Sequence, residues 1–117
     1  MARWTGWWEQ RAFGRQLMRN LVLVVDAQGL VTGGGDDCVG PFTFSGQFHA
    51  DGQITLEKQY IGRHRVTYEG RNSGEGIFGT WHIPDGWFFY ESGKFALRPL
   101  ADGATDLEEI RELAAQG

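Results

Sequence analysis

Apolar and polar residues alternate along most of the chain, in short runs that end at Gly, Asp or Asn. Alternation with a period of two predicts β-strands that bury one face. The expected strands lie at about 4–11, 17–26, 29–34, 41–50, 53–61, 64–71, 76–83 and 87–98. Because the connections between them are too short for crossover helices, consecutive strands should be antiparallel neighbours. The pattern therefore predicts an all-β fold, an eight-stranded antiparallel up-and-down β-barrel (a meander), with residues 1–117 forming one domain.

The pattern changes to a helical period near the C-terminus, in the stretch TDLEEIRELAA. Thr105 is the expected N-cap, and a glutamate three residues later stands in the capping-box position. An apolar stripe at helical spacing follows, formed by Leu107, Ile110 and Leu113. We expect a short amphipathic α-helix at about 105–115 that packs against the barrel.

The inward positions of four central strands are mostly aromatic or aliphatic. They are Phe42, Phe44 and Phe48; Ile54, Leu56, Lys58 and Tyr60; His64, Val66, Tyr68 and Gly70; and Ile77, Gly79, Trp81 and Ile83. Two polar residues, Lys58 and His64, therefore stand in rows that should face the core. A turn at 61–63 would gather these two side chains with Tyr60 and Tyr68 near one mouth of the barrel.

The composition agrees with a barrel, since the chain has 18 glycines and 14% aromatic residues. An inward glycine such as Gly79 would leave room for a ring from a neighbouring strand. Eight strands enclose a space that side chains can just fill. With this many rings inside, we expect little empty volume, and any cavity should be small and close to one mouth.

Charge and cysteine content narrow the classes of partner. The formal net charge is −4, and the lysines and arginines are scattered rather than gathered into the basic patch of a nucleic-acid-binding protein. The longest apolar run, LVLVV, is too short to span a bilayer. We therefore expect no nucleic acid and no membrane as a partner. Cys38 is the single cysteine, which rules out an internal disulfide and favours a reducing, cytoplasmic location.

Lys58 allows a functional and a structural interpretation. In a functional site, a buried ammonium could bind an anion or, with a lowered pKa, act as a base or amine nucleophile. In a structural role, the ammonium would pair with Asp36, Asp37 or Glu9, or extend out of the barrel mouth. The sequence does not choose between these roles, because a buried ammonium needs a partner that its spacing does not identify.

The three histidines do not predict a metal site. His49 and His82 should point outward and His64 inward, so the three rings cannot converge on one ion. His64 could transfer a proton beside a tyrosine, or simply form a hydrogen bond. The stretch GGGDDCVG lacks the lysine of a phosphate-binding loop. It predicts a flexible lid or wide bend between the third and fourth strands, with Asp36 or Asp37 bonding the turn backbone. We expect no cofactor and no metal, and no catalytic residue can be named.

One motif resembles a known superfamily. Gly6-Trp7-Trp8, on the first expected strand, is similar to the G-x-W signature of the calycins, which include lipocalins, fatty-acid-binding proteins and avidins. Arg98, at the end of the last strand, has the kind of position from which calycin arginines stack over that tryptophan. The stretches GGGDDCVGPFTFSG, KQYIGRHRVTYEG and GIFGTWHI look similar to small bacterial calycin-like domains of unassigned function. The resemblance implies a closed barrel with a small-molecule cavity, and it names no ligand.

These observations favour a calycin-like barrel that binds a small apolar or anionic ligand near one mouth. The predicted ligand-binding residues are Trp8, Phe44, Lys58, Tyr60, His64, Tyr68 and Trp81. One alternative is a cofactor-independent isomerase, cyclase or lyase in the same cavity, with His64 or Lys58 transferring a proton. Another is a filled barrel that acts as a protein-interaction module. The C-terminal helix or the aromatic run GWFFYE at 86–91 would then form the contact surface, and the aromatic run could equally join a homodimer.

Overall fold

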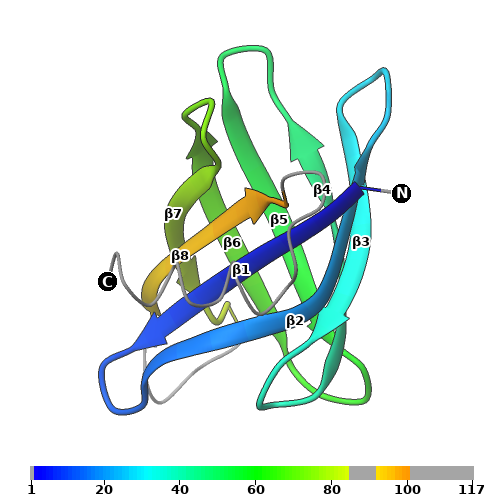
Figure 1. Cartoon of the computed structure of the whole chain (residues 1–117). Coiled ribbons are helices and arrows are strands. Elements are labelled where there is room, and N and C mark those ends of the chain that lie inside the picture. Colours follow the sequence, from blue (N-terminus) through cyan, green and yellow to red (C-terminus); the bar gives the residue numbers. More distant parts are fainter. Residues whose placement is uncertain (1, 85–91, 101–117) are drawn as a thin grey trace.

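Eight strands match those predicted from the alternation of residues (Figure 1). The structure is a computed structural model, and it describes residues 2–84 and 92–100. The strands are β1 (Ala2–Gln10), β2 (Gly14–Val25), β3 (Leu30–Asp36), β4 (Pro41–Phe48), β5 (Gln53–Tyr60), β6 (Arg65–Asn72), β7 (Ile77–His82) and β8 (Ser92–Pro99). The aromatic run at 86–91, with the start of the expected last strand, lies outside the described residues. The predicted helix at 105–115 lies outside them too, so both stay predictions.

The sheet closes on itself because β1 pairs with β8 as well as with β2. Figure 1 shows β1 and β8 side by side across the front of the barrel. The closure needs a glycine at position 6, where a Cβ atom would lie 2.6 Å from Leu97 Cδ2 and 2.9 Å from the Ala96 carbonyl oxygen. All neighbouring strands are antiparallel, which confirms the all-β up-and-down barrel.

The glycine-rich stretch continues the strand predicted at 29–34 as far as Asp36, so the lid or bend predicted between the third and fourth strands is shorter than expected. Residues 33–35 belong to β3 and pair with β4, and residues 33 and 34 also pair with β2. A Cβ atom at Gly33 would lie 2.0 Å from the Val22 carbonyl oxygen, so β2 passes too close for a side chain. The turn itself is confined to Asp37 and the next three residues, where Asp37 and Gly40 exchange two backbone hydrogen bonds.

The core fills the centre of the barrel with side chains from the predicted inward rows. Its buried members are Trp8, Met18, Leu21, Leu23, Val31, Phe42, Phe44, Ile54, Leu56, Tyr60, Val66, Tyr68, Ile77, Trp81, Phe95 and Leu97. The Tyr68 ring meets Phe44 edge-on at 5.4 Å and Phe95 at 4.6 Å between ring centroids. The glycine that makes room for a ring is Gly70, where a Cβ atom would lie 3.0 Å from Phe95 Cζ. Its register partner Gly79, predicted for that role, is instead crowded by the β6 backbone.

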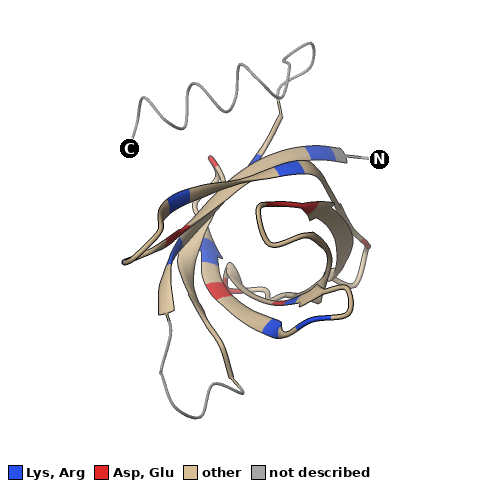
Figure 2. Cartoon of the chain, turned by 90° about the horizontal axis from the view of Figure 1, so that it is seen from below, with Lys and Arg blue, Asp and Glu red and all other residues tan. Residues whose placement is uncertain are grey.

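Charged side chains are distributed around the barrel. Figure 2 shows lysine and arginine on several strands, with aspartate and glutamate among them. Ion pairs on the outside include Arg15 with Glu9 at 2.6 Å and Arg19 with Asp36 at 3.4 Å. Within the described residues, no helix is long and apolar enough to cross a membrane.

Candidate functional site

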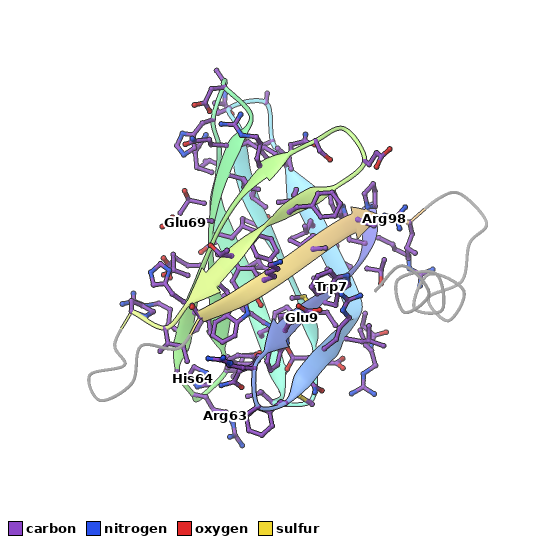
Figure 3. The ribbon with its side chains drawn as sticks, turned by 90° about the vertical axis from the view of Figure 1, so that its left-hand side faces the viewer. Trp7, Glu9, Arg63, His64, Glu69 and Arg98 are labelled. Carbon is purple, nitrogen blue, oxygen red and sulfur yellow. The ribbon has the colours of Figure 1, made fainter. Side chains whose placement is uncertain are left out.

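One mouth of the barrel opens into a cavity of about 500 Å³. The ends of β1, β3, β5 and β7 meet at this mouth because the strands alternate in direction; His64 marks it in Figure 3. The cavity is lined by Trp8, Gln10, Phe13, Gln16, Cys38, Val39, Tyr60, His64, Val66, Tyr68, Trp81 and Ile83. Small-molecule sites occupy roughly 300–1,000 Å³. The expectation of little empty volume is therefore wrong, because the rings pack on one another in the centre and leave this mouth unfilled.

A buried carboxylate beside the cavity organises the polar groups. Asp37 follows β3 in the turn to β4 and is 4% exposed. Its Oδ2 accepts hydrogen bonds from Lys58 Nζ at 2.7 Å, the Tyr60 hydroxyl at 2.8 Å and Trp8 Nε1 at 3.1 Å. Its Oδ1 accepts one from the Val39 backbone N–H at 2.9 Å, as predicted for an aspartate bonding this turn. We call Asp37, Lys58, Tyr60, Trp8 and Tyr68 the Asp37 cluster.

Lys58 is a fully buried ammonium whose partner is Asp37. Its side chain has no exposed surface, and Nζ also donates to the Tyr68 hydroxyl oxygen at 3.2 Å. The faces of Phe42 and Tyr60 lie 4.2 Å and 4.7 Å from Nζ, measured to the ring centroids. Burial lowers the pKa of Lys58 to about 8, although the charge of Asp37 opposes that shift. The structural interpretation of Lys58 as one half of an ion pair is thus confirmed, and its side chain does not line the cavity.

The other cluster members hold fixed protonation states around neutral pH. Burial alone would raise the pKa of Asp37, but the charge and hydrogen bonds of Lys58, with those of Tyr60 and Val39, hold it below its ordinary value. Burial raises the pKa of Tyr60, and the nearby Asp37 charge raises it further. The same two causes raise the pKa of Tyr68 well above its ordinary value. Asp37 is therefore an anion at neutral pH, while both phenols keep their protons.

The structure brings five of the seven predicted site residues together at the mouth: Trp8, Tyr60, His64, Tyr68 and Trp81 all line the cavity. Trp81 meets the edge of Trp8 at 5.9 Å between ring centroids. The Trp81 Nε1–H group donates a hydrogen bond to the Glu9 carbonyl oxygen at 3.0 Å. The indole passes over β8 at Gly93, where the Cβ atom of any other residue would lie 2.7 Å from Nε1. Lys58 and Phe44 lie behind the lining, and the Phe44 ring contacts the Tyr68 ring edge-to-face.

His64 is exposed, so its assignment to an inward row is wrong. The reason is the strand boundary, because β6 begins at Arg65 and His64 still belongs to the preceding turn. Its ring lies tilted against Tyr60, 5.2 Å between centroids, at the rim of the cavity (Figure 3). His64 is thus a rim residue rather than a member of the buried cluster.

Asp37 is the central residue that sequence reasoning did not place in the site. The sequence offered three carboxylates for Lys58, and the adjacent pair Asp36-Asp37 gave no reason to prefer either one. The useful signal was positional: Asp37 follows β3 at the same mouth where β5 ends with Tyr60. Asp36 points away and pairs with Arg19, while its Oδ2 accepts from Asn20 at 3.0 Å.

The position of Arg98 differs from the one that the calycin resemblance implied. Arg98 is in register with Thr5, and Trp8 is in register with Phe95. Trp8 faces the interior, where the Lys58 ammonium lies 5.7 Å from its ring centroid. Figure 3 shows Arg98 at the far end of β8 from His64.

Two further features bear on what the site can hold. In the part of the chain that the structure describes, no group of three or more His, Cys, Asp or Glu side chains is placed to hold a metal ion. Cys38 is an exposed residue at the mouth. Partial burial of its thiol raises the pKa of Cys38, and the charge of Asp37 raises it further.

Comparisons with protein-family models, with curated proteins and with solved structures gave no match. The functional interpretation therefore depends on the cavity and the Asp37 cluster.

Proposed function

We propose that this protein binds an uncharged, largely apolar small molecule in the cavity at the mouth of the barrel. The supporting observation is the cavity, about 500 Å³ in volume and lined mostly by aromatic and aliphatic side chains. Among its described lining residues there is no Asp, Glu, Lys or Arg. A charged ligand would lose its hydration there without gaining a counter-ion, so a neutral ligand is favoured.

An anionic ligand, which the sequence also allowed, has less support. The Lys58 ammonium that would hold it already pairs with Asp37 at 2.7 Å, behind the cavity lining. An anion in the cavity would therefore meet a neutral ion pair instead of an unpaired cation. This is the physical reason to propose an uncharged ligand.

Kinship with calycin-like barrels is part of the same proposal. It is supported by the roles of the two residues of the G-x-W pattern. Gly6 permits the close approach of β8, while Trp8 lines the cavity and donates a hydrogen bond to Asp37. A cytoplasmic location and the absence of nucleic-acid and membrane partners remain predictions from the sequence.

The two alternative functions also remain predictions. For an isomerase, cyclase or lyase, His64 is the lining residue that could transfer a proton, from its exposed position at the rim. For a filled interaction module, an open cavity is unfavourable, and the aromatic run proposed as its surface, or as a homodimer contact, lies outside the described residues.

The test uses two fluorescent probes that share one skeleton. N-phenyl-1-naphthylamine is uncharged, and 8-anilino-1-naphthalenesulfonate adds a sulfonate to it. We expect the uncharged probe to bind more tightly, and Val39→Trp, which fills the cavity mouth, to abolish binding. Val24→Trp is the matched control, since Val24 is 41% exposed on β2 and does not line the cavity. Equal binding of the uncharged probe to both variants, or tighter binding of the sulfonate, would contradict the proposal.

A further inference from the structure

Almost every hydrogen-bonding group of the Asp37 cluster is already used within the protein. The Asp37 carboxylate accepts four hydrogen bonds, and one of them takes the proton of the Tyr60 hydroxyl. The Lys58 ammonium donates to Asp37 and to the Tyr68 oxygen, and its remaining side faces the Phe42 ring. This leaves one donor to account for, the hydroxyl proton of Tyr68.

The Tyr68 hydroxyl has no acceptor for its proton in the part of the chain that the structure describes. Its oxygen accepts from Lys58, while Tyr68 itself is 2% exposed and lines the cavity. The backbone of Tyr68 lies in the middle of β6, paired with Leu56 and Trp81. Its hydroxyl oxygen lies at the Lys58 ammonium, beside Asp37. Because Asp37 lies in a turn at the mouth, the hydroxyl is the end of Tyr68 that points toward the cavity.

A buried donor without an acceptor destabilises the empty protein, and an acceptor on a ligand would remove that cost. The ammonium that donates to the Tyr68 oxygen also draws electron density from its O–H bond, which makes the proton a stronger donor. The raised pKa of Tyr68 keeps that proton in place at neutral pH. The cavity thus has a largely apolar wall and, within the Asp37 cluster, a buried donor whose proton has no acceptor among the described residues.

We propose that the Tyr68 hydroxyl, with the Lys58 ammonium behind it, binds the carbonyl oxygen of an apolar ketone or aldehyde in the cavity. A carbonyl oxygen only accepts, so it needs no acceptor in return from the apolar wall. A carboxylate would meet the neutral Lys58–Asp37 ion pair and gain no unpaired cation in return for its lost hydration. This inference rests on the proposed function, because it names the ligand class of the same cavity.

The test compares two ligands of the same shape, 2-acetylnaphthalene and 2-isopropenylnaphthalene, in which an oxygen is exchanged for a methylene group. Their affinities are measured by titration calorimetry for the wild type, Tyr68→Phe and Tyr60→Phe. The ratio of ketone to hydrocarbon affinity should fall about tenfold or more in Tyr68→Phe, the effect of one hydrogen bond with a charged group behind it. The ratio should be unchanged in Tyr60→Phe, because the Tyr60 proton is already held by Asp37.

The outcomes separate the two proposals. If both ligands bind and Tyr68→Phe leaves the ratio unchanged, or if Tyr60→Phe lowers it equally, the Tyr68 assignment is wrong while the binding cavity stands. If neither ligand binds the wild type, the proposed function fails and the inference fails with it.

A measurement on the wild type alone covers the case in which Tyr68→Phe does not fold. The ketone is labelled with ¹³C at its carbonyl carbon, and the resonance of the bound form is compared with reference spectra in hexane and in methanol. A strong hydrogen bond moves the resonance to or beyond its position in methanol. A bound resonance at the hexane position would overturn the inference.

Discussion

Replacing Lys58 by methionine tests the central electrostatic claim, that the Asp37 carboxylate is tolerated inside the barrel because an ammonium lies 2.7 Å away. Methionine keeps most of the apolar stem, so packing against Phe42 and Tyr60 changes little. The variant leaves Asp37 with the donors Trp8, Tyr60 and Val39 but without a cation. The expected result is a large loss of folding free energy at neutral pH.

The magnitude follows from the burial of both partners, whose side chains have no exposed surface. Removing one partner of a buried pair costs about 3–5 kcal/mol. Because three donors to Asp37 remain, we expect the lower end, about 3 kcal/mol, out of a total stability of about 5–15 kcal/mol for a domain of this kind.

The dependence on pH should have opposite signs in the two proteins. In the wild type the pKa of Asp37 lies below its ordinary 3.8, so the pair contributes stability above pH 3.8 that is lost as the pH falls through the lower value. Without Lys58, burial is the dominant influence and raises the pKa of Asp37. The variant therefore loses folding stability above that raised pKa, where Asp37 is charged, and regains it in acid, where Asp37 is protonated. The stability gap should therefore narrow as the pH falls from neutral toward 4.

Urea unfolding followed by tryptophan fluorescence, at several pH values, measures the gap. Lys94→Met is the matched control, the same substitution at an exposed lysine on β8, and should change stability by less than about 0.5 kcal/mol. Adding Asp37→Asn to Lys58→Met should recover stability and remove the pH dependence of the gap. A loss below about 1 kcal/mol, or a double variant no more stable than Lys58→Met, would refute the reasoning.

Two further predictions concern packing and reactivity. Gly79→Ala should cost about 1–3 kcal/mol in urea unfolding, because its Cβ atom would lie 2.0 Å from the Glu69 carbonyl oxygen; Gly62→Asn, at φ +75 with nothing within 4 Å, should be nearly neutral. Equal stability of both variants would contradict the close approach of β6 and β7. Alkylation of Cys38 by iodoacetamide, followed by mass spectrometry, should reach half its maximal rate above pH 9.0 in the folded protein. In Asp37→Asn this midpoint should lie at a lower pH than in the wild type. A midpoint below 9.0 in the folded wild type would contradict the raised pKa of Cys38.

The barrel was predictable from the sequence because period-two alternation and short turns constrain strands directly. The rows containing Phe44, Lys58 and Tyr68 all face inward as expected. The errors occur where local sequence is ambiguous. Glycines occur both in turns and in closely approaching strands, so the strand predicted at 29–34 ended two residues before β3 does. The strand predicted from residue 64 begins one residue later, at Arg65, which leaves His64 outside β6.

The site was only half predictable, because its polar partners come from distant strands. The inward row predicted that Lys58 needs a counter-ion, but the choice of Asp37 depends on how β3 and β5 are placed around the barrel. The hydrogen bond from Trp8 to Asp37 likewise joins residues that are neighbours in no strand pair. Contacts across a barrel interior leave no pattern in the alternation, and only coordinates reveal them.

The pairing of β1 with β8 has a consequence for the order in which this protein folds. The hairpins from β2 to β7 join segments that are close in sequence, and the ion pair of Lys58 with Asp37 needs only strands β3 to β5. Trp8, on β1, pairs with Gln16 on the adjacent β2, but its second strand partner, Phe95, is available only when the last strand has been made. Such a long loop closes late and at a high entropic cost. During synthesis, the Asp37 cluster, whose members come from β1 to β6, can therefore form first, while the pairing of β8 with β1 beside Trp8 closes the barrel last.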